Sequence, residues 1–457
     1  MSVADQKDPI SFSPFPVTRE TAGWAASLQD QDIPAEAYIR ATHVLLDWLG
    51  CTIAGQREPL VAMLRDELAG ESEGACTLIA SGARARLHDA ALINGAAAHA
   101  LDYDDVNRRL HGHPTACIAP AVMALGEMLG SSGRDVLVSF IAGTEAACAL
   151  GEMSEEGHYE AGFHATGTMG TFGAGVAAAK LMGLDEHKTA MALGVAASQA
   201  AGLKANFGSM TKPFHAGKAA MNGLLAARLA ARGFTASDIA IEGAHGFAQA
   251  QAPGFEPSPI RPDASSPWAV EQMLYKYHAS CFLTHSTLDA IRALHEEHMF
   301  TLEDVEAATI TIRATHRSVC CIAEPDTGLE IKFSISHLAA MGLDGADTSA
   351  LDTYSDENAN DPRYRQARER IHLDLVEDMD RSGARVTLEL KDGRSLKGEA
   401  NVGVPARDTD EQWRKLSAKF RSLAEPVIGE ARTQNLTGLI AGLEREKNVR
   451  ALMKAAG

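Results

Sequence analysis

The chain has 457 residues, of which 46% are hydrophobic and 22% are charged, the composition of an ordinary globular protein. Its net charge is −18 at pH 7. A surface of that sign repels phosphate, which argues against a general nucleic-acid binder or an anionic-membrane binder. An anionic small substrate remains possible, but it would need a local positive site.

The cysteines and the first residues indicate an intracellular protein. The seven cysteines show no regular spacing, and no Cys-x-x-Cys run is present, so neither a secreted disulfide framework nor an iron–sulfur hydratase is expected. The polar start Met1–Ile10 does not read as a signal peptide. No apolar run reaches the roughly 18 residues that a membrane helix needs. The expected location is the cytoplasm.

The first half of the chain is rich in Ala, Gly and Leu, a composition typical of helices. Apolar residues repeat at helical spacing from Ile39, and Gly50 is predicted to end that helix as a cap. Small residues on several sides, as in Gly173–Ala179, predict helices that are buried on more than one face and closely packed. Further helices are predicted at about 86–101, 117–129, 133–151, 172–182, 187–203, 217–232 and 285–298, several of them ending at Gly130, Gly183 or Gly233.

The pattern changes after about residue 250, where prolines mark an irregular stretch. Strand-like alternation follows in Ala308–Arg313 and Arg385–Leu390, and Lys391–Arg394 is a hairpin turn signal. Helical pieces are predicted at Ser334–Leu343 and Pro362–Ile371. The stretch from about 270 to 405 therefore predicts a small α+β domain, and the tail from about 409 is helical and could pack back on the first domain.

Three short motifs are better explained by structure than by chemistry. Gly70–Gly74 spells the G-x-S-x-G nucleophile elbow, but that motif needs a strand before it and a helix after it, so a loop is predicted. Gly167–Gly173 resembles a dinucleotide loop without the βαβ context. His295–His298 reads as a charged, solvated helix face rather than a metal site.

Four segments combine His or Lys with Gly or Pro at predicted helix beginnings. The first contains Asp102, Asp104 and Asp105, then His111, and then His113 directly before a proline that suits the first turn of a helix. Asp102 and His113 have two possible roles, which the sequence leaves open: they cap loop backbone, or they take part in catalysis.

The second segment has His164 between glycines, ahead of a Gly/Ala-rich helix. The glycines would let another group approach the backbone closely, whereas a satisfied loop histidine is the plain alternative.

The third segment, Gly208–Ala220, is the most informative. It places Lys212, His215 and Lys218 at the positive end of a long helix, where cations oppose the helix dipole. A bound anion or a nearby carboxylate would resolve this, and Asp102 is the candidate carboxylate. The dipole also favours a neutral His215. The proline after Lys212 is expected to hold that lysine extended.

The fourth segment contains Lys276, Cys281 and His285 at the start of the second predicted domain. Lys276 and His285 could face the first domain across a cleft. A polar seam at a domain hinge is the alternative.

Taken in order, these segments resemble the MmgE/PrpD family of 2-methylcitrate dehydratase, cis-aconitate decarboxylase and iminodisuccinate epimerase. The resemblance covers about three quarters of the chain. It is carried by Asn94-Gly95, Asp102–Asp105, Gly112–Pro114, His164, Thr211–Gly217, Lys276, Cys281, His285, Lys332–Ser334 and Leu343–Gly345.

The resemblance implies a mainly α fold. A large all-helical domain would comprise 1–269 and 408–457, with a smaller α+β lid domain, 270–407, inserted before the C-terminal helical tail. It also implies a homodimer, no cofactor and no metal. By the same resemblance the catalytic residues are Asp102, His113, His164, Lys212 and Lys276, and His215, Cys281 and His285 are substrate-binding.

The expected chemistry is the creation of negative charge on carbon next to a carboxylate, which needs a base and fixed positive groups. Lys212, Lys276 and His164 would hold carboxylates and the enolate, while Asp102 and His113 would transfer protons, or Asp102 would orient His113. Closure of the small domain would exclude water.

The expected function is a metal-independent lyase, of dehydratase or decarboxylase type, acting on a di- or tricarboxylic acid. Decarboxylase-like members have Thr and His where this chain has Val106 and Cys281, and the stretches Gly157–His164 and Asn206–Gly208 look more like the epimerase. An epimerase of an iminodisuccinate-like dicarboxylate is therefore the first alternative. A non-catalytic carboxylate-binding protein is the second. No nucleic-acid or membrane partner is expected.

Overall fold

The computed structural model describes residues 15–69, 74–261, 263 and 265–457. Contacts between Cα atoms divide the chain into two compact units. The first unit comprises Met1–Met273 and Asp408–Gly457, and the second comprises Leu274–Arg407. Helices dominate the chain, so the predicted mainly α class is confirmed.

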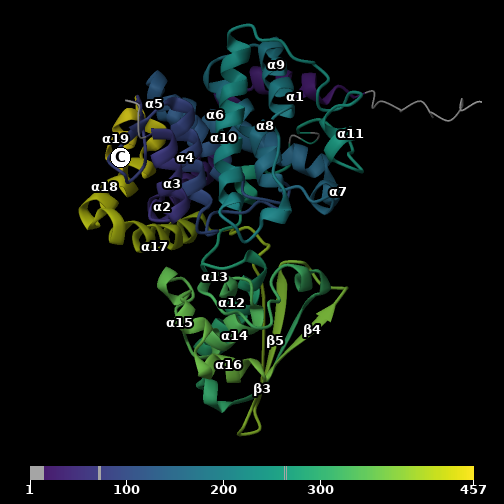
Figure 1. The fold of residues 1–457 in the computed structure, drawn as a ribbon, viewed down its shortest axis with the longest axis vertical. Helices are drawn as coiled ribbons and strands as arrows, with labels where there is room; N and C mark the ends of the chain where they lie inside the picture. The colour runs from purple at the N-terminus through teal and green to yellow at the C-terminus, as the bar shows by residue number, and fades with distance from the viewer. Residues whose placement is uncertain (1–14, 70–73, 262, 264) are drawn as a thin grey trace, which may run out of the picture. The chain divides into compact units, whose positions relative to one another are not determined.

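Among the described residues of the first unit, the only strands are β1 (Cys76–Thr77) and β2 (Arg84–Ala85), which pair over two residues, and the other regular elements are helices. Figure 1 shows α8 and α10 side by side among its helices. The helices are α1 (Val17–Ser27), α2 (Ala35–Gly55), α3 (Pro59–Ala69), α4 (Leu87–His99), α5 (Pro114–Leu129), α6 (Gly133–Met153), α7 (Glu155–Glu160), α8 (Ala165–Leu181), α9 (Glu186–Ala197), α10 (Thr211–Ala231), α11 (Phe247–Gln251), α17 (Thr409–Ile428), α18 (Glu430–Ala441) and α19 (Arg450–Ala456).

Small residues let the central helices approach one another closely. Helix α8 is buried without interruption from Ala165 to Ala179, which confirms the predicted burial on several faces. A Cβ atom on Gly217 of α10 would lie 2.1 Å from the backbone oxygen of Leu92 on α4. Only glycine permits that contact, and the contact brings the start of α10 against α4.

Several sequence predictions about helix ends are wrong, and α8 and α10 begin at Ala165 and Thr211 rather than near 172 and 217. Helix α2 continues through Gly50 to Gly55, since Gly50 serves to admit the ring of Phe420, whose Cδ2 would lie 3.0 Å from an added Cβ. Helix α9 ends at Ala197 rather than near 203. Lys212 is helical rather than extended, because Pro213 lies in the first turn of α10, where a missing N–H costs nothing.

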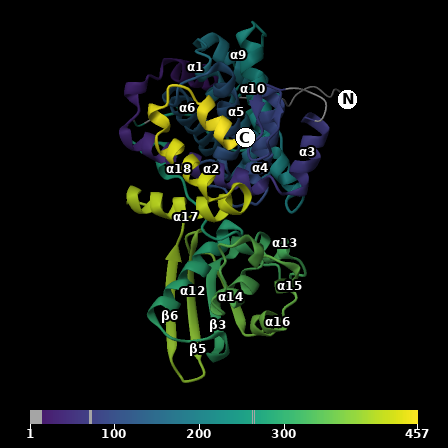
Figure 2. The same cartoon turned by 90° about the vertical axis from the view of Figure 1, so that its left-hand side faces the viewer.

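The C-terminal helices return to the first unit. Figure 2 shows α17 and α18 beside α2, and a buried ion pair joins α17 to α2. Lys419 Nζ lies 2.7 Å from Asp47 Oδ1 and also donates a hydrogen bond to the backbone oxygen of Tyr103. The tail therefore touches the segment that leads into Asp104 and Asp105.

Helix α6 is long and apolar enough to cross a membrane by length and composition. Glu145 and Glu152 interrupt its apolar residues, so no unbroken apolar run of that length is present in it, although the mean hydropathy of an 18-residue window reaches 1.4. Since 94% of that window is buried, α6 is a core helix of the first unit.

The second unit is an α+β arrangement built on one four-stranded sheet. Its strands lie in the order β4-β3-β5-β6, with β3 parallel to β4 and the other neighbours antiparallel. The elements are α12 (His285–Glu297), β3 (Val305–Arg313), α13 (Gly328–Ile331), α14 (Ile335–Leu343), α15 (Asp356–Ala359), α16 (Pro362–Arg368), β4 (Ile371–Val376), β5 (Gly383–Leu390) and β6 (Ser395–Asn401).

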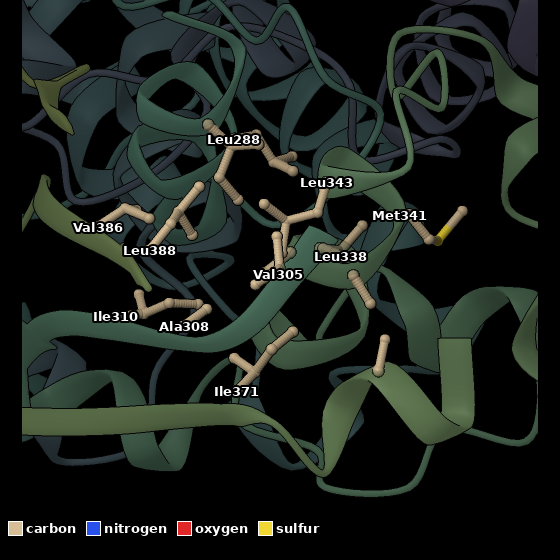
Figure 3. Packing of buried hydrophobic residues seen from close by; sticks show 14 of the residues in the cluster. Leu288, Val305, Ala308, Ile310, Leu338, Met341, Leu343, Ile371, Val386 and Leu388 are labelled. Carbon is tan, nitrogen blue, oxygen red and sulfur yellow. The ribbon is translucent and has the colours of Figure 1, made fainter. Parts of the chain in front are cut away.

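Alternating burial along β3 turns one face of the sheet toward α12 and α14. Figure 3 shows the resulting core, in which Ile310 and Val386 come from the sheet and Leu288 and Leu338 from the helices. The β5–β6 hairpin confirms the turn predicted at 391–394. The predicted helix through Ile371 is wrong at its end, because Ile371 pairs with Ala308 as the first residue of a strand that sequence periodicity missed.

Candidate active site

A sharp turn after α4 places the acidic segment. Helix α4 ends at His99, and Asp102 follows in the left-handed region with φ of 51°. Aspartate tolerates this conformation better than most side chains, which explains its occurrence here. The chain then runs to His113, the residue that precedes Pro114 at the start of α5, as predicted.

Lys212, Asp102 and His113 form a cluster at this turn. Lys212 Nζ lies 2.9 Å from Asp102 Oδ1, and His113 Nε2 lies 3.7 Å from the same oxygen. The side chains are 13%, 18% and 12% exposed, so each is partly open to solvent. The carboxylate expected near Lys212 is therefore Asp102, and three predicted site residues come together.

A buried layer lies behind the cluster. His99 Nδ1 lies 2.9 and 3.0 Å from the two oxygens of Asp104, and His113 Nδ1 lies 3.3 Å from Asp104 Oδ2. Burial alone would raise the pKa of Asp104, but the two imidazoles outweigh it and hold that pKa well below its usual range. Burial lowers the pKa of His99 to about 4. At neutral pH, Asp104 is thus an ionised carboxylate that faces a neutral His99.

The pKa of the neighbouring Asp105 is shifted in the opposite direction. Burial, reinforced by the charges of Asp104 and Asp47, raises its pKa well above the usual value. Thr115 donates a hydrogen bond of 2.9 Å to its Oδ2. Burial and neighbouring groups therefore shift the pKa values of two adjacent, fully buried carboxyl groups in opposite directions, a difference that sequence alone does not reveal.

His164 and His215 make a second pair of imidazoles. Their Nδ1 atoms lie 3.1 Å apart, and both side chains are buried. Burial lowers the pKa of each, so both rings are neutral and one nitrogen donates to the other. The His164 ring lies edge-on to Phe207, whose ring also lies below Lys212 Nζ. The second pair therefore borders the first cluster.

Four of these side chains have the donor set of a metal site. One ligand atom each from His99, Asp102, Asp104 and His113 lies within 4.8 Å of the other three. However, the Lys212 ammonium group is already paired with Asp102 Oδ1, and His99 Nδ1 is within hydrogen-bond distance of both Asp104 oxygens. A cation would have to displace these partners, so the residues do not fit a metal as they stand, and we assign none to them.

The remaining predicted residues belong to the second unit. Lys276, Cys281 and His285 are all buried there. The Cys281 N–H donates to the backbone oxygen of Lys332, and His285 Nε2 lies 3.3 Å from the backbone oxygen of Ser280. The roles assigned to these three residues remain predictions.

Sequence reasoning missed His99. It is the last residue of an Ala-rich helix, where a single histidine carries no motif, and its role arises only because the chain turns back at Asp102. The G-x-S-x-G string gives no further site to describe, since residues 70–73 lie outside the described residues.

Comparison with known proteins identifies the class to which this helical fold and its acid–imidazole–lysine cluster belong. The MmgE/PrpD N-terminal domain matches residues 19–260, and the MmgE/PrpD C-terminal domain matches residues 278–445. The chain belongs to the MmgE/PrpD family, which confirms the resemblance found from the sequence.

Similar proteins are cis-aconitate decarboxylases. That of Aspergillus terreus is 26% identical over 469 aligned residues, which cover 96% of this chain and 95% of that protein. That of Mus musculus is 27% identical over 379 residues, covering 78% and 75%, and that of Homo sapiens is 28% identical over 377 residues, covering 78% and 76%. With the family, these relatives identify the chain as an enzyme of the lyase type.

Proposed function

We propose that this enzyme is a dehydratase- or decarboxylase-type lyase of small di- or tricarboxylic acids, acting by proton transfer at the carbon next to a carboxylate. The observation that carries this proposal is the cluster of Lys212, Asp102 and His113, partly open to solvent. The cis-aconitate decarboxylases among its relatives support a carboxylate of this size.

The cluster supplies what the chemistry needs. A carbon acid beside a carboxylate is weak, because ionisation adds negative charge to a group that is already charged, so a fixed cation and a positioned proton carrier are required. Lys212 is the cation, and it lies in the first turn of the 21-residue α10, where the helix dipole adds positive potential. His113 is the proton carrier.

The ion pair also defines how substrate would enter. A substrate carboxylate takes the place of Asp102 as partner of Lys212, which leaves Asp102 to accept a proton or to orient His113. In a dehydration, one of the pair removes the α-proton while an acid protonates the departing hydroxyl. In a decarboxylation, carbon dioxide leaves and His113, once its Nε2 has taken up a proton, delivers that proton to the carbon. Lys276 is proposed as a second cation for the substrate.

An epimerase is the second candidate. Val106 and Cys281 depart from the decarboxylase-like pattern, and epimerisation needs proton carriers on both faces of one carbon. The pair of His164 and His215 is a second set of imidazoles beside His113 and supports such an arrangement.

We further propose that the enzyme needs no metal, works as a homodimer in the cytoplasm, and closes residues 270–407 as a lid over the helical domain. The ion pair between Lys212 and Asp102 supports a reaction without metal, because the lysine takes the oxygen that a cation would need. Dialysis against a chelator should leave turnover unchanged, and sedimentation should give a dimer mass. Activity that returns only with added zinc would refute the metal-independent reaction.

The test of the proposal is turnover of a panel of citrate-, aconitate- and aspartate-derived acids followed by proton NMR. A new alkene or a released carbon dioxide supports the lyase, and inversion without net loss supports the epimerase. Binding of an acid without any product supports a non-catalytic protein and contradicts both.

A further inference from the structure

We propose that Asp104 is a positioning residue that fixes the proton of His113 on Nδ1 and leaves Nε2 free on the side of Asp102 and Lys212. His99 assists by holding the Asp104 carboxylate in place. This inference rests on the proposed function for its catalytic meaning, but its structural content is tested without any substrate.

The geometry dictates where the protons lie. Asp104 is fully buried, and an ionised carboxylate accepts hydrogen bonds but cannot donate them. His99 Nδ1 at 2.9 and 3.0 Å must therefore carry a hydrogen. His113 Nδ1 lies 3.3 Å from Asp104 Oδ2 without hydrogen-bond geometry, but the buried anion still favours an N–H over a lone pair on this nitrogen. A neutral His113 then has its lone pair on Nε2, 3.7 Å from Asp102 Oδ1.

The two imidazoles of His99 on α4 and His113 before α5 are the groups that lower the pKa of Asp104. Other titratable groups near it are Asp102, with an oxygen within 4.8 Å, Asp105 in the same loop, Cys51 on α2 and Cys117 on α5, and Lys212 acts on the adjoining His99. The two imidazoles are the partners that offer it hydrogens, and their ring centroids lie 4.4 Å apart. Asp104 thus lies between two histidines whose rings are tilted by 54° to one another, and only His113 reaches the partly open cluster.

Asp105 provides a matched control. It is equally buried and adjacent in sequence, but burial and the charge of Asp104 raise its pKa, and its Oδ2 accepts from Thr115 rather than from an imidazole. The amide replacement at Asp105 therefore removes no partner of His113, whereas the same replacement at Asp104 removes the carboxylate that faces His113 Nδ1. Asp104→Asn and Asp105→Asn are thus the same chemical edit with different expected consequences.

The experiment is long-range ¹H–¹⁵N NMR on protein labelled in its histidine rings, at pH 8 and without substrate. The His113 signals are identified by their loss in His113→Gln. We expect the wild type to show a protonated Nδ1 and an unprotonated Nε2. Asp104→Asn should lower the Nδ1–H fraction below one half, since an amide can donate as well as accept, and Asp105→Asn should leave it unchanged.

The wild-type spectrum alone decides the case even where Asp104→Asn fails to fold. A wild-type His113 with its proton on Nε2 would overturn the proposal, as would an Asp104→Asn spectrum identical to the wild type. With an active acid, Asp104→Asn should lower kcat at least tenfold with little change in KM. A correct tautomer in a protein that turns over no acid would leave the positioning intact and refute the proposed function instead.

Discussion

Lys212 Nζ, in the first turn of α10, lies 2.9 Å from Oδ1 of Asp102, in the turn that follows α4. The two residues meet because Gly217 lets α10 approach the backbone of α4 and because Asp102 adopts a left-handed conformation. Both features concern the backbone rather than the charged groups. Together they bring two charges that are far apart in the sequence into an ion pair that is partly open to solvent.

Replacing Lys212 by alanine should lower kcat/KM about 10²–10³-fold, the range found when a fixed positive group or hydrogen-bond donor for the developing charge is lost. The fold should persist, because the ammonium group lies at a partly open site. The measurement is steady-state turnover of the active acid beside circular dichroism. Lys218→Ala removes the same charge from the same helix and should cost less than tenfold, so equal losses in the two variants would count against a specific role for Lys212.

Stability should fall on acidification between about pH 6.5 and 4. Burial lowers the pKa of His99 to about 4 in the folded protein, while an unfolded histidine titrates near 6.5. In this window the unfolded chain binds a proton that the folded chain does not, so the free energy of unfolding decreases as pH falls. A shift of this size corresponds to about 3 kcal/mol.

Denaturant unfolding at pH 7, 5.5 and 4.5 measures this effect. His99→Gln should show a shallower pH dependence than the wild type, because glutamine can still donate to Asp104 but does not titrate. If the wild type and His99→Gln lose the same unfolding free energy as the pH falls, His99 is not a source of the pH dependence.

The ion pair between Lys419 and Asp47 should be costly to break. Both side chains are nearly fully buried, and removing one partner leaves a charge without compensation, which typically costs about 3–5 kcal/mol. Lys419→Met should therefore lower the unfolding free energy by about that amount. The double variant Lys419→Met/Asp47→Asn should recover part of the loss. Additive effects of the two single changes in a double-mutant cycle would contradict the coupling.

Two helical glycines should respond oppositely to alanine. Gly217→Ala should destabilise strongly, because the new methyl group would collide with the Leu92 backbone oxygen. Gly438 on α18 is exposed with open space around it, so Gly438→Ala should stabilise by about 0.5–1 kcal/mol through helix propensity. Thermal unfolding of both variants checks the pair. A Gly217→Ala variant with unchanged stability would show that α4 and α10 can move apart without loss of folding free energy.

Much of the fold could be predicted from sequence because its signals are local. Ala/Gly-rich periodicity located the central helices of the first unit, although α1 and α3 were not predicted, and alternation located β3 and β5. Strand β4 was missed because its short pattern follows α16 directly, and its identity depends on pairing with β3. Gly50 was misread as a cap because only the return of α17 shows why a glycine is needed there.

The site could be predicted in part for a related reason. His113 and Lys212 stand beside prolines at helix starts, which marked them. His99 carries no such mark, and the difference between Asp104 and Asp105 depends on which buried carboxylate meets imidazole nitrogens. These properties arise from tertiary packing and leave no trace in local sequence.

The most direct test of the central claim is deuterium uptake at carbon. The wild type and Asp102→Asn are incubated in heavy water with the acid that the wild type converts, and ¹H NMR follows the proton next to the carboxylate. Asparagine tolerates the left-handed backbone of Asp102 but carries no charge, so the fold should survive. We predict rapid deuterium incorporation by the wild type and at least 100-fold slower incorporation by Asp102→Asn. Incorporation at the wild-type rate in the variant would contradict proton transfer through this cluster.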